Sequence, residues 1–246
     1  MKIVHIKQKL EELGVSPEGV IMGDFDAIGE FTAKRTRSSD DPNYKKFGVF
    51  YRANYERMIL VYNLIRQYNL TSMLEIGFGR GAATFAAAKA FHDAGVVGNI
   101  VTIDPKFDDR HMQMVQQVFP KEWFGFVKFA QGRSQDVLPT LTESFDLVYI
   151  DGDHSYAGTK LDWELTKDKC NKVILFDDYH LPTKEDAGIQ CRTAIDEIDW
   201  ASAGFGDPEL IRMDRRMFVD ERSYTDEQID YGQVLALKAG VSTNEW

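Results

Sequence analysis

Short apolar runs and amphipathic segments alternate along most of this chain. The apolar runs at 73–76, 99–103, 126–130, 145–150 and 172–176 predict strands, and the segments at 52–69, 82–94, 109–119, 155–169 and 188–200 predict helices. The strands are continuously apolar rather than alternating, which is typical of parallel strands covered by helices on both faces. The pattern therefore predicts an α/β fold built on a Rossmann-like, doubly wound and mostly parallel sheet.

The C-terminal part of the chain follows a different pattern. The apolar runs 209–213 and 216–219 are separated only by Asp214 and Arg215. Because this gap is too short for a crossover, we expect an antiparallel hairpin that completes a seven-stranded sheet. After the hairpin, Thr225 has a glutamine three residues later, which is the spacing of a capping box and predicts a C-terminal helix.

The first 50 residues differ from the rest of the chain. Glycines interrupt them, and the segment 34–42 is a continuous polar stretch. We therefore expect an N-terminal arm or lid at 1–50, built from a short helix and irregular chain, followed by one main domain at 51–246. Because such arms often make dimer contacts, a homodimer is one expectation.

Composition narrows the class of protein. Lys and Arg total 29 against 39 Asp and Glu, so the formal net charge is −10. This acidic balance argues against nucleic-acid or anionic-membrane partners, since both require clustered cations. The two cysteines have no metal-type spacing, and no 18-residue apolar run or secretory signal is present. These features predict a reduced, cytoplasmic protein with no membrane partner.

A glycine-rich turn follows the first strand of the main domain. Glu75 precedes Gly77, Gly79 and Gly81, and glycines at alternate positions allow a ligand to approach the backbone closely. The run also satisfies the loose dinucleotide pattern, so an NAD(P)-dependent oxidoreductase is one alternative. Glu75 disfavours it, because a carboxylate beside a pyrophosphate is repelled, whereas a cationic ligand is attracted. In either case Asp104, which closes the second strand, is expected to bind ribose hydroxyls.

The motif E-x-G-x-G-x-G with an acid ending the second strand resembles the class I S-adenosylmethionine-dependent methyltransferases, over roughly residues 52–220. The resemblance implies that Glu75, Gly77, Gly79 and Gly81 hold the methionine part of the cofactor and that Asp104 holds the ribose. The later run G-R-S-Q-D at 132–136 is similar to the adenine-side loop of catechol-type and caffeoyl-CoA-type O-methyltransferases. That similarity implies adenine contacts from Ser134 and Gln135. Without it, Ser134 is simply a helix cap.

Acidic residues follow the fourth and fifth strands of the main domain. These are Asp151 and Asp153 after one strand and Asp177 and Asp178 after the next. Parallel neighbouring strands would place them on one edge, where crowded carboxylates raise one another's pKa values unless a cation lies among them. Oxygen ligands favour Mg²⁺, Mn²⁺ or Ca²⁺. The alternative is that Asp151 binds the cofactor ammonium while Asp177 and Asp178 cap the following loop.

These acids also resemble a known ligand set. In metal-dependent O-methyltransferases the matching residues bind the metal, which implies Asp151, Asp177 and Asp178 as ligands here. Those enzymes carry a lysine base three residues after the first Asp, and this chain has His154, which can also accept a hydroxyl proton. The run I-D-G-D-H-S-Y is similar to a broad bacterial methyltransferase family and to macrolide-sugar O-methyltransferases. His180 is a second candidate base.

The function predicted from the sequence is S-adenosylmethionine-dependent O-methylation of a small hydroxylated molecule, assisted by a divalent cation. Two alternatives stay open at this point. One is the NAD(P)-dependent oxidoreductase, and the other is a non-catalytic protein that binds the cofactor as a partner. The four acids argue against the second alternative, since a binding module has no need of several costly charges on one edge.

Overall fold

The computed structural model describes residues 1–15, 54–107, 109–180, 190–213 and 231–242. The predicted strand at 216–219 and the predicted helix start at Thr225 lie outside these residues, as does most of the 1–50 arm. None of the described helices is long and apolar enough to cross a membrane.

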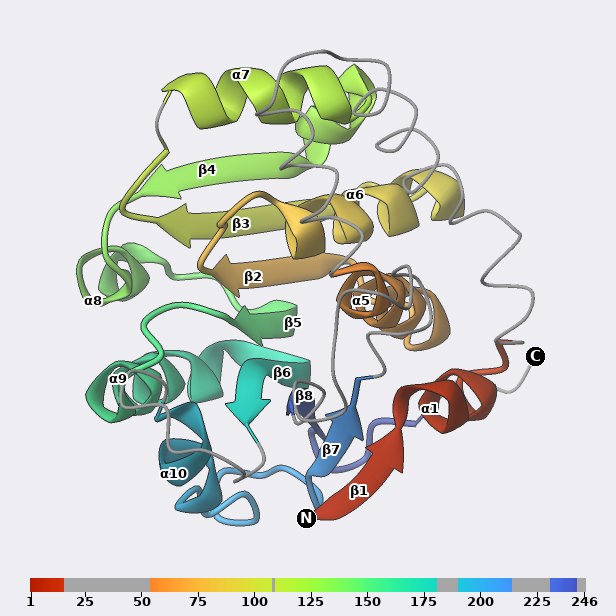
Figure 1. Ribbon diagram of the computed structural model, residues 1–246, viewed down its shortest axis with the longest axis vertical. Helices are drawn as coiled ribbons and strands as arrows, with labels where there is room; N and C mark the ends of the chain where they lie inside the picture. Colours follow the sequence, from red (N-terminus) through yellow and green to blue (C-terminus); the bar gives the residue numbers. More distant parts are fainter. Residues whose placement is uncertain (16–53, 108, 181–189, 214–230, 243–246) are drawn as a thin grey trace, which may run out of the picture.

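One eight-stranded sheet runs through the molecule (Figure 1). Its strands are β1 (Lys2–His5), β2 (Ser72–Ile76), β3 (Asn99–Asp104), β4 (Val127–Gln131), β5 (Phe145–Ile150), β6 (Cys170–His180), β7 (Glu209–Arg212) and β8 (Tyr231–Leu237). Their spatial order is β1-β7-β8-β6-β5-β2-β3-β4, and β8 pairs antiparallel with both of its neighbours while the other pairs are parallel. The predicted α/β fold with a mostly parallel sheet is therefore confirmed.

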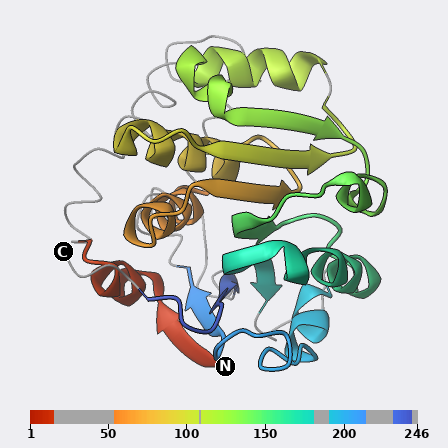
Figure 2. The same ribbon diagram turned by 180° about the vertical axis from the view of Figure 1, so that it is seen from behind.

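Helices cover both faces of the sheet, as predicted. They are α1 (Ile6–Glu12), α5 (Tyr55–Gln67), α6 (Ala82–Ala94), α7 (Asp109–Val118), α8 (Ser134–Val137), α9 (Tyr156–Thr166) and α10 (Cys191–Asp196). Successive strand residues point to opposite faces: Met73 joins the core under α1, α5, α6 and α7, whereas Leu74 joins the core under α9 and α10. The view from behind in Figure 2 shows the sheet from β4 at the top to β1 at the bottom.

Two predictions about the sheet are wrong. The sheet has eight strands rather than seven, because Lys2–His5 pairs in parallel with β7 through partners such as Val4 and Ile211. The predicted antiparallel pairing at the C-terminal end of the sheet is present, but the partner of β7 is Tyr231–Leu237 rather than 216–219. This partner strand lies in the region where the capping box predicts a helix. Val234, Leu235 and Ala236 are all buried, since β8 lies inside the sheet between β6 and β7 and both of its faces are covered. Burial in the tertiary structure therefore determines that this segment is a strand and not a helix.

The strands β2 and β5 approach each other closely where they end. The ladder continues past the strand end, with the Asp151 N–H donating to the Ile76 carbonyl at 2.8 Å. Gly77 has φ +91°, and a Cβ there would lie 1.9 Å from the Asp151 carbonyl oxygen. Gly79 has φ +52°, but its Cβ would enter open space. The first glycine is therefore required by packing and the second only by backbone conformation.

This difference predicts unequal costs for two alanine substitutions. Gly79→Ala should lower the free energy of unfolding by about 1–2 kcal/mol, the cost of a left-handed residue with a Cβ. Gly77→Ala should cost a further ~1–3 kcal/mol, because the methyl group collides with backbone that cannot move aside cheaply. Urea unfolding of both variants measures the difference. Equal losses would contradict the close approach of β2 and β5.

Candidate functional site

A cavity of about 510 Å³ opens at the carboxyl ends of β2, β3 and β5, at the edge where α8 and α9 lie (Figure 1). Its walls include the predicted cofactor residues Gly77, Gly79, Asp104, Ser134, Gln135 and Asp151. Ile76 and Ile103 add apolar surface at the ends of β2 and β3. A volume of this size matches the usual range for cofactor-sized ligands. The structure therefore brings together six of the eight residues that the sequence predicts for cofactor binding.

Asp104 is held in place by backbone donors. Its Oδ2 accepts the Gly79 N–H at 3.2 Å, and its Oδ1 accepts the Lys106 N–H at 2.7 Å. The carboxylate is thus fixed at the edge of the cavity while each oxygen keeps a lone pair for a ligand. This is an arrangement suited to accepting hydrogen bonds from a pair of hydroxyl groups.

The other two predicted cofactor residues, Glu75 and Gly81, do not line the cavity. Glu75 is 1% exposed and accepts hydrogen bonds from the hydroxyls of Thr84 and Thr102. Burial raises the pKa of Glu75 to about 8, although both hydrogen bonds oppose the shift. Gly81 is the N-cap of α6, and a Cβ there would lie 2.8 Å from the ring of Phe78. Both residues therefore stabilise the glycine turn by packing inside the protein and do not face the cavity.

The sequence analysis missed Asp162, a cavity residue on α9. Asp162 is 2% exposed and lines the cavity together with Ser134. Burial raises the pKa of Asp162 to about 6. Its position in the middle of an amphipathic helix gave no signal in the pattern, because only the packing of α9 against α8 turns it toward the cavity.

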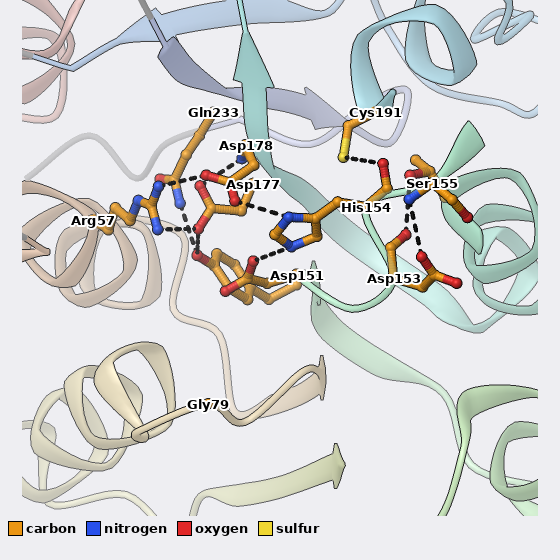
Figure 3. Close-up of polar contacts among 12 residues, drawn as sticks. Arg57, Gly79, Asp151, Asp153, His154, Ser155, Asp177, Asp178, Cys191 and Gln233 are labelled. Carbon is orange, nitrogen blue, oxygen red and sulfur yellow. Dashed lines mark hydrogen bonds and ion pairs between the residues drawn. The ribbon is translucent and has the colours of Figure 1, made fainter. Parts of the chain in front are cut away.

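A second group of polar residues lies beside the cavity and shares Asp151 with it (Figure 3). The His154 ring lies between two carboxylates, with Nε2 3.2 Å from Asp151 Oδ1 and Nδ1 3.1 Å from Asp178 Oδ2. The hydrogen bond to Asp151 and the charge of Asp178 raise the pKa of His154 to about 9, against the effect of burial. The imidazole is therefore mainly protonated at neutral pH and compensates both acids.

Arg57, on α5, supplies a cation that the sequence analysis did not anticipate. Its guanidinium forms ion pairs of 2.8 Å with Asp177 Oδ2 and 2.7 Å with Asp178 Oδ1. A protein cation therefore already lies among these acids, so they do not need a metal ion to balance their charge. Arg57 is 120 positions before Asp177 in the chain, so no sequence spacing connects them. The sequence offered one sign of this role. Arg57 directly precedes the apolar Met58 on a helix that was predicted to pack on the sheet, so it lies close to the buried face of that helix.

Asp177 does not line this cavity. It is 3% exposed, and besides Arg57 it accepts hydrogen bonds from the Tyr149 hydroxyl and the Asp178 N–H, both at 2.8 Å. Gln233 on β8 in turn donates to the Tyr149 hydroxyl at 2.9 Å. Burial raises the pKa of the Asp177 carboxyl, and the Arg57 guanidinium opposes this. The structure thus groups Asp151, His154 and Asp178, while both oxygens of Asp177 are bonded to other parts of the protein.

The arrangement of Asp151, His154 and Asp178 can accept a metal ion. One ligand atom from each residue lies within 4.8 Å of the others. A cation with bonds of about 2.0–2.5 Å to two atoms spans such separations. Asp178 reaches this position with a left-handed backbone, φ +53°, which an aspartate tolerates better than most residues. The side chain of His180, the second candidate base, lies outside the described residues.

Comparison with known proteins identifies the class. Residues 74–179, which contain the glycine turn and all four predicted acids, match the family model of a methyltransferase domain. No curated protein sequence matches the chain. The matched segment is therefore similar to a methyltransferase domain, and the fold is that of the class I methyltransferases. This match favours a methyltransferase over the NAD(P)-dependent oxidoreductase.

Solved structures share this fold across most of the chain. An O-methyltransferase from Bacillus cereus in complex with S-adenosylhomocysteine aligns with a TM-score of 0.57 and 16% identity, covering 87% of this chain and 91% of that chain. The O-methyltransferase TomG from Streptomyces achromogenes, involved in tomaymycin synthesis and solved with S-adenosylmethionine, aligns with a TM-score of 0.54 and 20% identity over 89% and 100%. A methyltransferase from Podospora anserina bound to S-adenosylhomocysteine aligns with a TM-score of 0.53 and 21% identity over 87% and 88%.

The buried ion pairs of Arg57 predict a large effect on stability. Arg57→Met should lower the free energy of unfolding by about 3–5 kcal/mol at neutral pH, because it leaves buried carboxylates without their cation. The loss should shrink as the pH falls, since the carboxyls then take up protons. Urea unfolding at two pH values measures both effects.

Arg192→Met is the matched control. Arg192 pairs with Asp196 at 3.4 Å, and both side chains are more than a third exposed, so its loss should cost less than about 1 kcal/mol. Equal effects of the two substitutions would show that the Arg57 pairs are not buried as described.

Proposed function

We propose that this methyltransferase transfers a methyl group from S-adenosylmethionine to a hydroxyl oxygen of a small molecule, with assistance from a divalent cation. One observation carries the proposal: Asp151 lines the cofactor cavity and at the same time contacts His154. The space for the methyl donor therefore adjoins a group that can remove a proton. O-methylation requires these two features side by side.

The cofactor would be held along the cavity by residues with distinct tasks. Asp104 would accept hydrogen bonds from the ribose hydroxyls, because each of its oxygens keeps a free lone pair. Asp151 would attract the ammonium group of the methionine part, and Gly77 and Gly79 would allow its close approach to the backbone. The sulfonium would then lie on the His154 side of the cavity. Holding donor and acceptor in line supplies much of the rate enhancement in such a displacement.

His154 would accept the proton that the acceptor hydroxyl loses. At neutral pH its ring is protonated and paired with Asp151 and Asp178, so it must first lose its own proton. A second cation that binds these two carboxylates weakens their hold on the imidazolium and lowers the pKa of His154. The same ion pairs with Asp151 and Asp178 that hold His154 in place therefore also keep it protonated and unable to act as a base.

A divalent cation would be held by Asp151 and Asp178, with Asp177 behind them fixed by Arg57 and Tyr149. When bound, such a cation supplies positive charge that lowers the pKa of an acceptor hydroxyl. Carboxylate ligands alone suit Mg²⁺, whereas participation of the imidazole nitrogen favours Mn²⁺. The acceptor is proposed to be a small hydroxylated molecule, since O-methyltransferases of this fold are its structural neighbours.

Cofactor binding is the first test. Titration calorimetry should show that the wild-type protein binds S-adenosylhomocysteine and not NADH. Asp104→Asn should weaken this binding about 10- to 100-fold, the effect expected for losing a charged hydrogen-bond acceptor. Binding of NADH in place of S-adenosylhomocysteine would overturn the proposed function.

Metal removal is the second test. Activity on a panel of hydroxylated acceptors should fall at least about 10-fold after chelation and return with Mg²⁺ or Mn²⁺, because the cation stabilises the developing oxyanion. Asp178→Asn should show the same loss and no recovery at the metal concentration that restores the wild-type protein. Asp153→Asn is the control, since Asp153 is exposed, accepts the Ser155 N–H at 3.0 Å and does not belong to the group formed by Asp151, His154 and Asp178. Full turnover in EDTA would remove the metal from the mechanism.

The pH profile tests the base. His154 has a raised pKa, so its proton-accepting form is scarce at neutral pH and increases as the pH rises toward about 9. Without added metal, kcat/KM should therefore rise with pH up to about 9, and added Mn²⁺ or Mg²⁺ should shift the rise to lower pH. His154→Gln should abolish the rise. A wild-type profile that is flat from pH 7 to pH 9 would exclude His154 as the base.

A further inference from the structure

Three phenylalanine rings pack against one another where β2, β3 and β4 lie side by side (Figure 1). Phe129 belongs to β4, Phe78 lies in the glycine turn after β2, and Phe107 lies in the loop after β3. The ring centroids of Phe78 and Phe107 are 5.3 Å apart, and each lies 5.4 Å from the centroid of Phe129. All three distances are typical of favourable ring contacts. We call these three residues the aromatic triangle.

Phe78 anchors the aromatic triangle in the core. Phe78 is 3% exposed, and its ring meets the buried ring of Phe85 on α6 edge-on, with the centroids 6.4 Å apart. A Cβ on Gly81 would lie 2.8 Å from the Phe78 ring, so the third glycine of the turn leaves the space that this ring fills. Phe107 and Phe129 are partly buried and pack against the same core. The triangle therefore ties two loops to the interior of the protein.

Two members of the triangle are chain neighbours of the groups that hold Asp104. Phe78 directly precedes Gly79, whose N–H donates to Asp104 Oδ2 at 3.2 Å. Phe107 directly follows Lys106, whose N–H donates to Asp104 Oδ1 at 2.7 Å. Because both rings are packed on β4, the two backbone donors are fixed relative to the sheet.

The orientation of Asp104 depends on these donors. Asp104 is partly exposed at the cavity wall, so packing around its own side chain does not fully restrict the carboxylate. A hydrogen bond weakens steeply when its angle is poor, and a binding group must be held within about 0.5 Å of its productive position. Such precision comes from neighbours whose conformation is locked by packing, as it is for the two loops here.

We infer that Phe78, Phe107 and Phe129 are positioning residues, which hold the two backbone donors of Asp104 so that its carboxylate meets the ribose hydroxyls of the cofactor. None of the three lines the cavity, so they act through Asp104 and do not touch the ligand. The inference rests on the proposed binding of S-adenosylmethionine in this cavity. It assigns part of the selection for a hydroxylated ribose to residues outside the cavity.

The test compares two ligands by titration calorimetry. One is S-adenosylhomocysteine, and the other is its 2′-deoxy analogue, which lacks one ribose hydroxyl. The wild-type protein should bind the first about 10- to 100-fold more tightly, the effect of one hydrogen bond to a charged acceptor. Phe107→Ala should reduce this preference about 3- to 10-fold, mainly by weakening the first ligand, because the Lys106 N–H is no longer fixed. Phe107→Tyr keeps the ring and should retain the wild-type preference.

Phe126→Ala is the matched control. Phe126 directly precedes β4, is also partly buried and packs on Phe91 with the ring centroids 6.1 Å apart, outside the triangle. Its loss removes a similar ring from the core but should leave the preference unchanged. Phe129→Leu removes the ring that the two loops share and keeps an apolar side chain, so the preference should again fall at least about 3-fold. This variant decides the matter if Phe107→Ala does not fold.

The outcomes separate the inference from the proposed function. If Phe107→Ala and Phe129→Leu weaken both ligands by the same factor, the triangle only stabilises the fold, and the inference is wrong although the cofactor site stands. If the wild-type protein binds the two ligands equally, Asp104 does not recognise the missing hydroxyl, and the inference is wrong although the cofactor still binds. If the wild-type protein binds neither ligand, the proposed function is wrong and the inference is wrong with it.

Discussion

Charge compensation at the carboxyl edge of the sheet is the constraint on which this molecule depends. Asp151 directly follows β5, and Asp177 and Asp178 lie in β6 just after its pairing with β5 ends at Phe176. Three neighbouring carboxylates are not stable there without cations. Arg57, on α5, pairs with Asp177 and Asp178, and His154, in the loop before α9, pairs with Asp151 and Asp178. Folding therefore couples α5 to β6, where the paired aspartates lie at least 120 residues later in the chain.

The three acids differ in how their charge is compensated, and this gives them different roles. Asp177 is fully committed to Arg57, Tyr149 and the backbone, so it serves as a rigid support (Figure 3). Asp151 and Asp178 each keep an oxygen turned toward His154, where a proton or a metal ion can provide the positive charge. Asp151 also borders the cavity. The protonation of Asp151, His154 and Asp178 therefore changes the electrostatic potential at the place where the methyl group would be transferred. Structure and proposed chemistry thus share one set of residues.

Comparison of prediction and structure shows which signals were informative. The glycine turn and the acid that ends β3 were recognisable because backbone geometry restricts which residues can occupy them. Glu75 was recognised as special, but the structure places it beneath the turn, hydrogen-bonded to Thr84 and Thr102. Arg57 and Asp162 were missed because each lies on a helix, where a single polar residue gives no sign of the direction in which it points. The strand β8 was missed because its burial depends on partners distant in the sequence.

The sequence by itself determined the alternation of strands and helices, the parallel character of the sheet and the edge at which the cavity opens. These properties follow from local apolar periodicity and from the chain order of strands, which both act over short distances. Only the tertiary structure decided which acids face the cavity, which cation balances them and which strand pairs with β7. Those outcomes depend on the packing of α5, α9 and β8 onto the sheet, and a side chain finds its partner only when such distant elements come together.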